Sequence, residues 1–190
     1  SAEDRTNIGN PFPKMTLGLD LNASYKGFDI NVFIAGVYGN KLYNTNIYDL
    51  QGMPRLFNAG VEVLDRWDGE GSSNTIPRAG AVAANVQASS RFVENGAYTK
   101  LKNITLGYTL PSSLLKNKLT KLRVYVSAQN LICLTDYSGL DPEVGSYSTG
   151  GTALGVIGSP ATTAQNYANG IDVGNYPIPK SIIGGFQITF

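Results

Sequence analysis

Acidic side chains are the first candidates for chemistry in this sequence of 190 residues. Asp65, Asp68 and Glu70 fall within one Gly-rich turn, and hard cations such as Ca²⁺ bind several carboxylate and carbonyl oxygens. Their spacing is not that of an EF-hand loop, so a solvated acidic turn is favoured over a calcium site. Asp141 and Glu143 suggest a carboxylate pair for glycoside hydrolysis. Carboxylates two positions apart are common outside active sites, however, and the pair is not assigned a catalytic role.

Nucleophilic catalysis has no support in the composition. The chain contains no His and a single Cys, so a Ser-His or Cys-His pair cannot form within it. Cys133 lies among Leu131, Ile132 and Leu134 and is interpreted as a small apolar residue. The formal net charge of +1 argues against a strongly basic nucleic-acid surface. We expect no enzyme activity, no cofactor, no metal and no nucleic-acid partner.

Aromatic side chains are better candidates for binding. Trp67 comes before a turn and could stack on a sugar ring, although a packing role at the end of a helix is the commoner one. Tyr147, Tyr167 and Tyr176 lie in or beside a segment rich in Gly, Ser and Thr. Rigid amphipathic rings suit contact with a ligand or a partner protein. The same tyrosines could instead anchor the segment to its own protein, and both interpretations stay open.

Strict alternation of apolar and polar residues indicates the elements that would position these groups. It predicts five β-strands, near residues 14–25, 28–38, 98–110, 122–130 and 181–190. Each is close to the about 9–11 residues that a tilted membrane strand needs. No apolar run approaches the about 20 residues of a membrane helix. The fold class predicted is all-β, a transmembrane antiparallel β-barrel with apolar rows facing lipid.

The opposite rows of these strands are polar, as expected for a barrel lumen. The residues assigned to the lumen are Thr16, Asp20, Asn22, Asp29, Asn31, Thr105 and Gln129.

The connections between the strands alternate in length. Lys26-Gly27 is short and residues 111–121 form a connection of modest length, whereas residues 39–97 and 131–180 are long. Bacterial barrels have short periplasmic turns and long outer loops, so the two long segments are predicted to be outer loops. The last strand carries an apolar row that ends on the aromatic Phe190, which is typical of outer-membrane barrels. A soluble β-sandwich adhesin or structural module is the alternative, and it leaves this segregation unexplained.

A helix is expected in the first long connection. The apolar residues that recur at helical spacing between residues 47 and 67 are Leu50, Met53, Phe57, Val61 and Leu64. Pro54 lies inside this stretch, so the helix is predicted to be kinked or broken.

Many short motifs in one order resemble the SusC/RagA family of TonB-dependent outer-membrane transporters of the Bacteroidetes. The resemblance covers nearly the whole chain. The motifs that carry it are Ile8–Lys14, Phe33–Asn40, Val63–Trp67, Ile76–Arg78, Ser90–Tyr98, Leu101–Pro111, Leu122–Leu131, Gly139–Glu143 and Tyr176–Lys180.

The resemblance implies a 22-stranded barrel filled by an N-terminal plug. This chain would supply the C-terminal part, about five strands, with the plug absent. The implied function is active nutrient import across the cell outer membrane, of oligosaccharides first and oligopeptides as the alternative. Its implied partners are the rest of the barrel and plug, outer-membrane lipid, a SusD-like surface lipoprotein, and the TonB-ExbB-ExbD complex, which the missing plug part would contact.

Overall fold

The computed structural model describes residues 3, 5–54, 56, 58–80, 85–115, 119–144 and 169–190. The chain divides into two compact units that are described separately. One consists of Lys14–Tyr38, Ala97–Asp136 and Pro177–Phe190, and the other of Ser1–Pro13, Gly39–Gly96 and Tyr137–Tyr176. We call the first the sheet unit and the second the connection unit.

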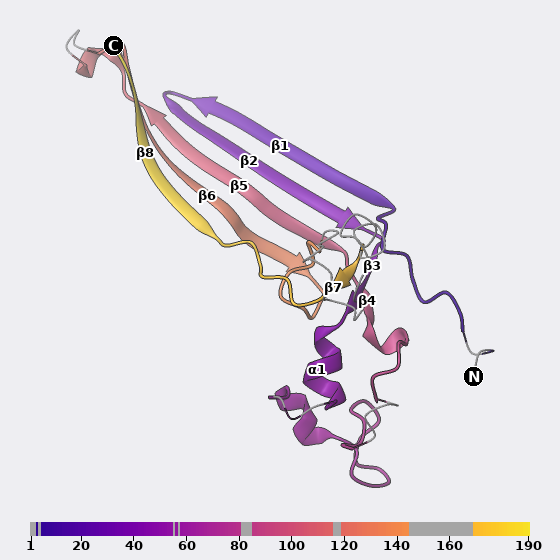
Figure 1. Ribbon diagram of the computed structural model, residues 1–190. Coiled ribbons are helices and arrows are strands. Elements are labelled where there is room, and N and C mark those ends of the chain that lie inside the picture. The colour runs from indigo at the N-terminus through magenta and orange to yellow at the C-terminus, as the bar shows by residue number, and fades with distance from the viewer. Residues whose placement is uncertain are drawn as a thin grey trace, which may run out of the picture. The chain divides into compact units, whose positions relative to one another are not determined.

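The sheet unit is a single five-stranded antiparallel sheet, in the order β1-β2-β5-β6-β8 (Figure 1). Its strands are β1 (Met15–Tyr25), β2 (Phe28–Tyr38), β5 (Tyr98–Thr109), β6 (Lys121–Thr135) and β8 (Ser181–Thr189). Strands are therefore present in all five places where the sequence alternates. β1 and β8 form the two edges, and neither edge is paired within the described residues.

The two faces of this sheet differ in chemistry because alternate residues of a strand point to opposite sides. Neighbouring strands pair in a register that brings the apolar rows together, for example Leu106 beside Ile30 and Val126. Leu17, Leu106 and Val126 are each 53% exposed. We call this side the apolar face and the other the polar face. An exposed apolar face of this extent is unlike a sandwich core, which a second sheet would cover.

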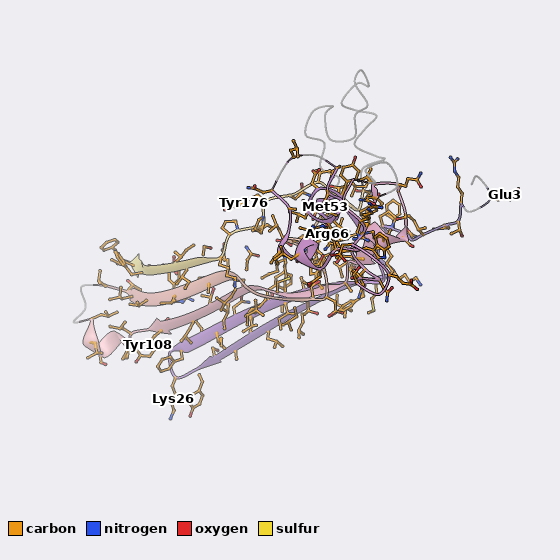
Figure 2. The ribbon with its side chains drawn as sticks, turned by 90° about the horizontal axis from the view of Figure 1, so that it is seen from below. Glu3, Lys26, Met53, Arg66, Tyr108 and Tyr176 are labelled. Atoms are coloured by element: carbon orange, nitrogen blue, oxygen red, sulfur yellow. The ribbon has the colours of Figure 1, made fainter. Side chains whose placement is uncertain are left out.

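A two-residue turn joins β1 to β2. Lys26 and Gly27 have φ angles of 48° and 90°, the pattern of a type I′ hairpin turn. The Thr109 backbone N–H donates to Gly27 O at 2.7 Å. A Cβ on Gly27 would lie 2.8 Å from Thr109 O, so this close approach also requires glycine. Lys26 and Tyr108 lie at the same end of the sheet (Figure 2).

A β-bulge in β5 changes which of its residues lie on the apolar face. Ile34 pairs with Leu101 while the adjacent Phe33 pairs with Asn103, so Lys102 is an extra residue in β5. Before the bulge the odd-numbered Leu101 is on the apolar face, and after it the even-numbered Ile104 is. The bulge thereby places the buried Lys100 opposite Ala35, on the polar face. Lysine on a lipid-exposed face near the bilayer midplane would cost about 2–4 kcal/mol.

Four strand ends differ from the sequence prediction by one residue, and the end of β6 differs by five. β6 continues to Thr135, five residues beyond the predicted end at 130, because pairing with β5 resumes at Leu101 and Ile132 after the irregularity around Asn130. Asn130 has a φ of 51°, a conformation that interrupts a strand locally without ending it. The second long connection therefore starts at residue 136 and not at 131. β8 ends at Thr189, one residue before Phe190.

The connection unit contains a small sheet in the order β4-β3-β7. Its strands are β3 (Lys41–Asn44), β4 (Val93–Asn95) and β7 (Ile171–Asp172), with β3 antiparallel to β4 and parallel to β7. Helix α1 (Asn46–Gly52) follows β3 directly.

The predicted helix is broken. α1 ends before Met53, which has a φ of 51° and precedes Pro54, a position that disfavours helical backbone. A single 3₁₀ turn, Val61–Asp65, follows further along, and residues Val61 and Leu64 are exposed. Phe57 and Arg55, which belong to the same stretch of sequence, lie outside the described residues.

No helix among the described residues is long and apolar enough to cross a membrane.

Candidate functional site

The residues that sequence alternation assigns to the lumen share the polar face. Thr16, Asp20 and Asn22 pair with Val37, Phe33 and Asn31 of β2, and Asn31 and Asp29 pair with Thr105 and Gly107 of β5. Gln129 of β6 pairs with Asn103 of β5. The register alone therefore places all seven on one side of the sheet, which is the arrangement that a polar wall needs.

Hydrogen bonds link this face across four strands. Asn31 Nδ2 donates to Asp20 Oδ1 and to Asn22 Oδ1, both at 2.8 Å. Asn103 Nδ2 donates to Asn31 Oδ1 at 2.9 Å, and Ser127 Oγ donates to Asn103 Oδ1 at 3.1 Å. We call this chain of side chains from β1 to β6 the polar ladder. Asn103 and Ser127 were not among the predicted site residues, although their odd numbers in alternating strands place them on this face.

An ion pair crosses the sheet beyond the end of the polar ladder. Arg123 Nε donates to Asp29 Oδ1 at 2.9 Å, and Arg123 Nη2 donates to Asp29 Oδ2 at 2.5 Å. The Arg123 guanidinium also lies 5.1 Å from the centre of the Tyr125 ring. Bidentate pairing fixes the position of both side chains, so this part of the polar face has a defined shape.

Trp67 borders an open hollow in the connection unit, of about 480 Å³. The wall opposite the ring is formed by residues 73–78 and Arg91, and we call this site the Trp67 hollow. The Arg78 guanidinium carbon lies 5.9 Å from the centre of the Trp67 ring, within cation–π range. Trp67 is 36% exposed, so part of its ring is open to a ligand.

Short-range hydrogen bonds hold the wall of this hollow. The Trp67 backbone N–H donates to Ile76 O at 3.0 Å, which closes the loop between them. Ser73 Oγ accepts from the backbone N–H of Ile76 at 3.2 Å. Arg91 Nη1 donates to Thr75 O at 2.6 Å, and Arg91 Nη2 donates to Gln51 Oε1 at 3.1 Å. Sequence reasoning selected Trp67 but missed Arg78 and Arg91, because the loop that brings them together has no signature in the local pattern.

The remaining predicted contact residues are not brought together. Tyr176 is 90% exposed and is labelled in Figure 2. Tyr147 and Tyr167 lie outside the described residues. Within the described part of the chain, no three His, Cys, Asp or Glu side chains gather as a metal site, and this part includes Asp65, Asp68 and Glu70.

A buried polar cluster joins three segments of the connection unit. Asp172 is 1% exposed. Its Oδ2 accepts from Tyr137 Oη at 2.6 Å and from Asn46 Nδ2 at 3.3 Å, and its Oδ1 accepts from the backbone N–H groups of Gly174 and Asn175 at 2.9 and 3.1 Å. With four donors, the buried carboxylate is well compensated for its loss of hydration.

Burial and the neighbouring carboxylate also act on Tyr137. Desolvation raises the pKa of the Tyr137 phenol above its ordinary value, and the hydrogen bond to Asp172 raises it further. Tyr137 therefore remains a hydrogen-bond donor at neutral pH. The cluster stabilises the fold of this unit and offers no group with a free position for chemistry.

Comparison with known proteins places this geometry in a class. No family model matches the chain. TonB-dependent receptor P3 of Formosa agariphila is 31% identical over 191 residues, which is 100% of this chain and 18% of that protein. TonB-dependent receptor SusC of Bacteroides thetaiotaomicron is 28% identical over 176 residues, 90% of this chain and 16% of that protein. Among solved structures, the RagAB peptide importer in its open-open state has a TM-score of 0.74 at 27% identity, covering 94% of this chain and 17% of that one.

The sheet has one exposed apolar face and one polar face, and it matches these proteins. Together these features define the chain as a segment of the wall of a TonB-dependent barrel transporter. It belongs to the TonB-dependent receptors of the SusC/RagA family, as the motifs of its sequence indicate. Members of this family are outer-membrane transporters. The chain spans less than a fifth of the length of the curated relatives it matches, 18% for the first of them.

Proposed function

We propose that this chain forms part of the barrel wall of an outer-membrane importer that takes up oligosaccharides. The main support is the two-faced sheet, since its exposed apolar face suits lipid and its polar face suits a solvated lumen or a plug. In this arrangement the end with the Lys26-Gly27 turn lies in the periplasm, and the segments 39–97 and 136–180 lie outside the cell. The seven predicted lumen residues line the inside of the wall.

The proposed partners follow from the relatives. A SusD-like lipoprotein would cover the outer connections, and TonB with ExbB and ExbD would act on the plug of the complete receptor. The SusC relative and the RagAB neighbours support this assembly. Trp67, Tyr176, Tyr147 and Tyr167 remain our candidates for contact with substrate or lipoprotein.

Oligopeptide import is the second candidate. It is favoured by the solved neighbours, which are a peptide importer and a peptide transporter.

Uptake measurements distinguish these functions. Cells that carry the complete receptor, or a deletion of its gene, would receive fluorescent oligosaccharides or oligopeptides of matched size. We expect oligosaccharide uptake that needs both the receptor and TonB, with the receptor in the outer-membrane fraction. Uptake of peptides alone would favour the second candidate, and uptake that is independent of TonB would contradict import by this family's mechanism.

A further inference from the structure

We propose that the Trp67 hollow binds an acidic sugar residue, a uronate, whose carboxylate pairs with Arg78 and whose ring stacks on Trp67. This inference rests on the proposed import function and specifies the substrate class. Trp67, Arg78 and Arg91 carry the argument, and all three lie in the connection unit.

The charge of the hollow is the first observation. Its lining contains two arginines and no carboxylate. Among the described residues, neither Arg78 nor Arg91 has an acidic partner. The hollow is therefore a positively charged site that lacks a counter-ion from its own fold, and a carboxylate pairs strongly with a guanidinium.

The two arginines have different roles. Both Nη atoms of Arg91 donate within the fold, to Thr75 O and Gln51 Oε1, and its Nε is buried without a partner in the described residues. Arg91 is thus a positioning residue that holds the loop and adds charge. Arg78 is exposed, and its side chain has no hydrogen-bond partner among the described residues, so its guanidinium is available to a ligand.

The Trp67 ring favours an anion that also has a sugar ring. A sugar ring presents an apolar face, which can cover the exposed part of Trp67, and hydroxyl groups that hydrogen-bond to polar walls. The exposed Asn74 and Thr75 side chains in the lining supply such walls. A uronate combines a ring face with a carboxylate, whereas a neutral sugar leaves Arg78 unpaired and a short peptide lacks the ring face.

Binding to the complete receptor in detergent tests this proposal. The probes for isothermal titration calorimetry are trigalacturonate, maltotriose and trialanine. We expect trigalacturonate to bind at least about tenfold more tightly than maltotriose, because the charged pair adds to stacking. Arg78→Gln should abolish this preference, Trp67→Ala should weaken trigalacturonate, and Trp67→Phe should restore part of the loss.

Arg66→Gln is the matched control. Arg66 is a neighbouring exposed arginine whose Nη1 donates to Val63 O and which does not line the hollow. Arg66→Gln should leave the affinities for all three probes within about twofold of the wild-type values. If the preference for trigalacturonate came only from the net charge of the protein, Arg66→Gln would lower its affinity as much as Arg78→Gln does. Equal affinities for trigalacturonate and maltotriose, or an unchanged preference in Arg78→Gln, would overturn the proposal. Trialanine binding that equals trigalacturonate and depends on Arg78 would assign the hollow to peptide carboxylates instead.

Uptake by cells separates this inference from the proposed function. If the wild-type receptor imports nutrients with TonB and the Arg78 and Trp67 variants import trigalacturonate equally well, the hollow is not a uronate site although import stands. If the receptor imports nothing while calorimetry shows the expected preference, import is refuted and the binding site stands.

Discussion

Arg123 on β6 reaches Asp29 on β2 across the intervening strand β5, and the pair lies directly above Gly107. A Cβ at Gly107 would fall within 2.6 Å of both Arg123 Nε and Asp29 Oδ1. The bidentate contact therefore exists only because β5 presents no side chain at this position. Three strands contribute one structural unit, which ties β2 to β6 without direct backbone pairing between them.

Gly107→Ala should displace this ion pair. We expect a lower free energy of unfolding, measured by urea titration of the complete receptor in lipid vesicles, because a partly exposed charged pair is lost. In an Arg123→Gln background the same substitution should add almost nothing. Gly18→Ala is the control on the same face, since its Cβ would meet only Phe33 Cε2 at 3.7 Å. Equal costs at the two glycines would contradict a role for the pair.

Arginine substitutions should distinguish the two faces of the sheet. Val126→Arg on the apolar face should cost about 2–4 kcal/mol if this face meets lipid near the bilayer midplane. Gln129→Arg should cost much less, because Gln129 is an exposed residue of the polar face. The same vesicle titration measures both. If Gln129→Arg proved as costly as Val126→Arg, the assignment of lipid and lumen would be wrong.

Removing the Asp172 carboxylate should loosen the connection unit. Asp172→Ala leaves four donors without their acceptor in a site that is 1% exposed, so we expect a local cost of about 3 kcal/mol or more. Limited proteolysis within residues 39–96 should become faster by at least about tenfold. The exposed Asp136 gives a control, and Asp136→Ala should not change the cleavage rate. Unchanged cleavage in Asp172→Ala would show that the cluster contributes little.

Tyr137 should make this unit sensitive to alkaline pH. Folding raises the pKa of its phenol above the ordinary value of 10.0, so the folded state favours the protonated form. The stabilisation is fully present below pH 10 and is lost as the pH rises through the higher folded-state pKa. Proteolysis at pH 8 to 11 should accelerate toward the alkaline end in the wild type. Tyr137→Phe should be cleaved faster than the wild type at pH 8, and its cleavage rate should depend less on pH. If the cleavage rates of the variant and the wild type rose with pH in parallel, Tyr137 would not be the source of the alkaline sensitivity.

Strict alternation was enough to predict the strands, their faces and the polar residues of β1 and β2. Pro54, inside a stretch of apolar residues at helical spacing, was enough to predict the break after α1. Alternation could not predict how the strands pair or where the pairing is irregular. Lys100 and Lys102 have the same parity as Ile104, so the sequence alone would place Lys100 on the apolar face. Only the pairing with β2 shows the bulge that moves it.

The sites in the connection unit were harder still. Tyr137 and Asp172 are separated by 35 positions, and Asn46 and Asp172 by 126. No local periodicity relates residues at such distances, since their contact depends on how the small sheet assembles. The same holds for Arg91, which supports the loop beside Trp67 from 16 positions beyond Thr75. Single residues of a suitable type, such as Trp67, could be selected, but not their partners.

The bulge at Lys102 also determines how the length of β5 can vary between related proteins. A one-residue deletion within a regular strand turns every side chain beyond it to the opposite face. Loss of Lys102 would instead join Leu101 to Asn103 in ordinary alternation and leave Leu101 and Lys100 on the faces they already occupy. Insertions and deletions among homologues should therefore concentrate at this position, because a change of one residue here does not exchange the apolar and polar faces of the strand.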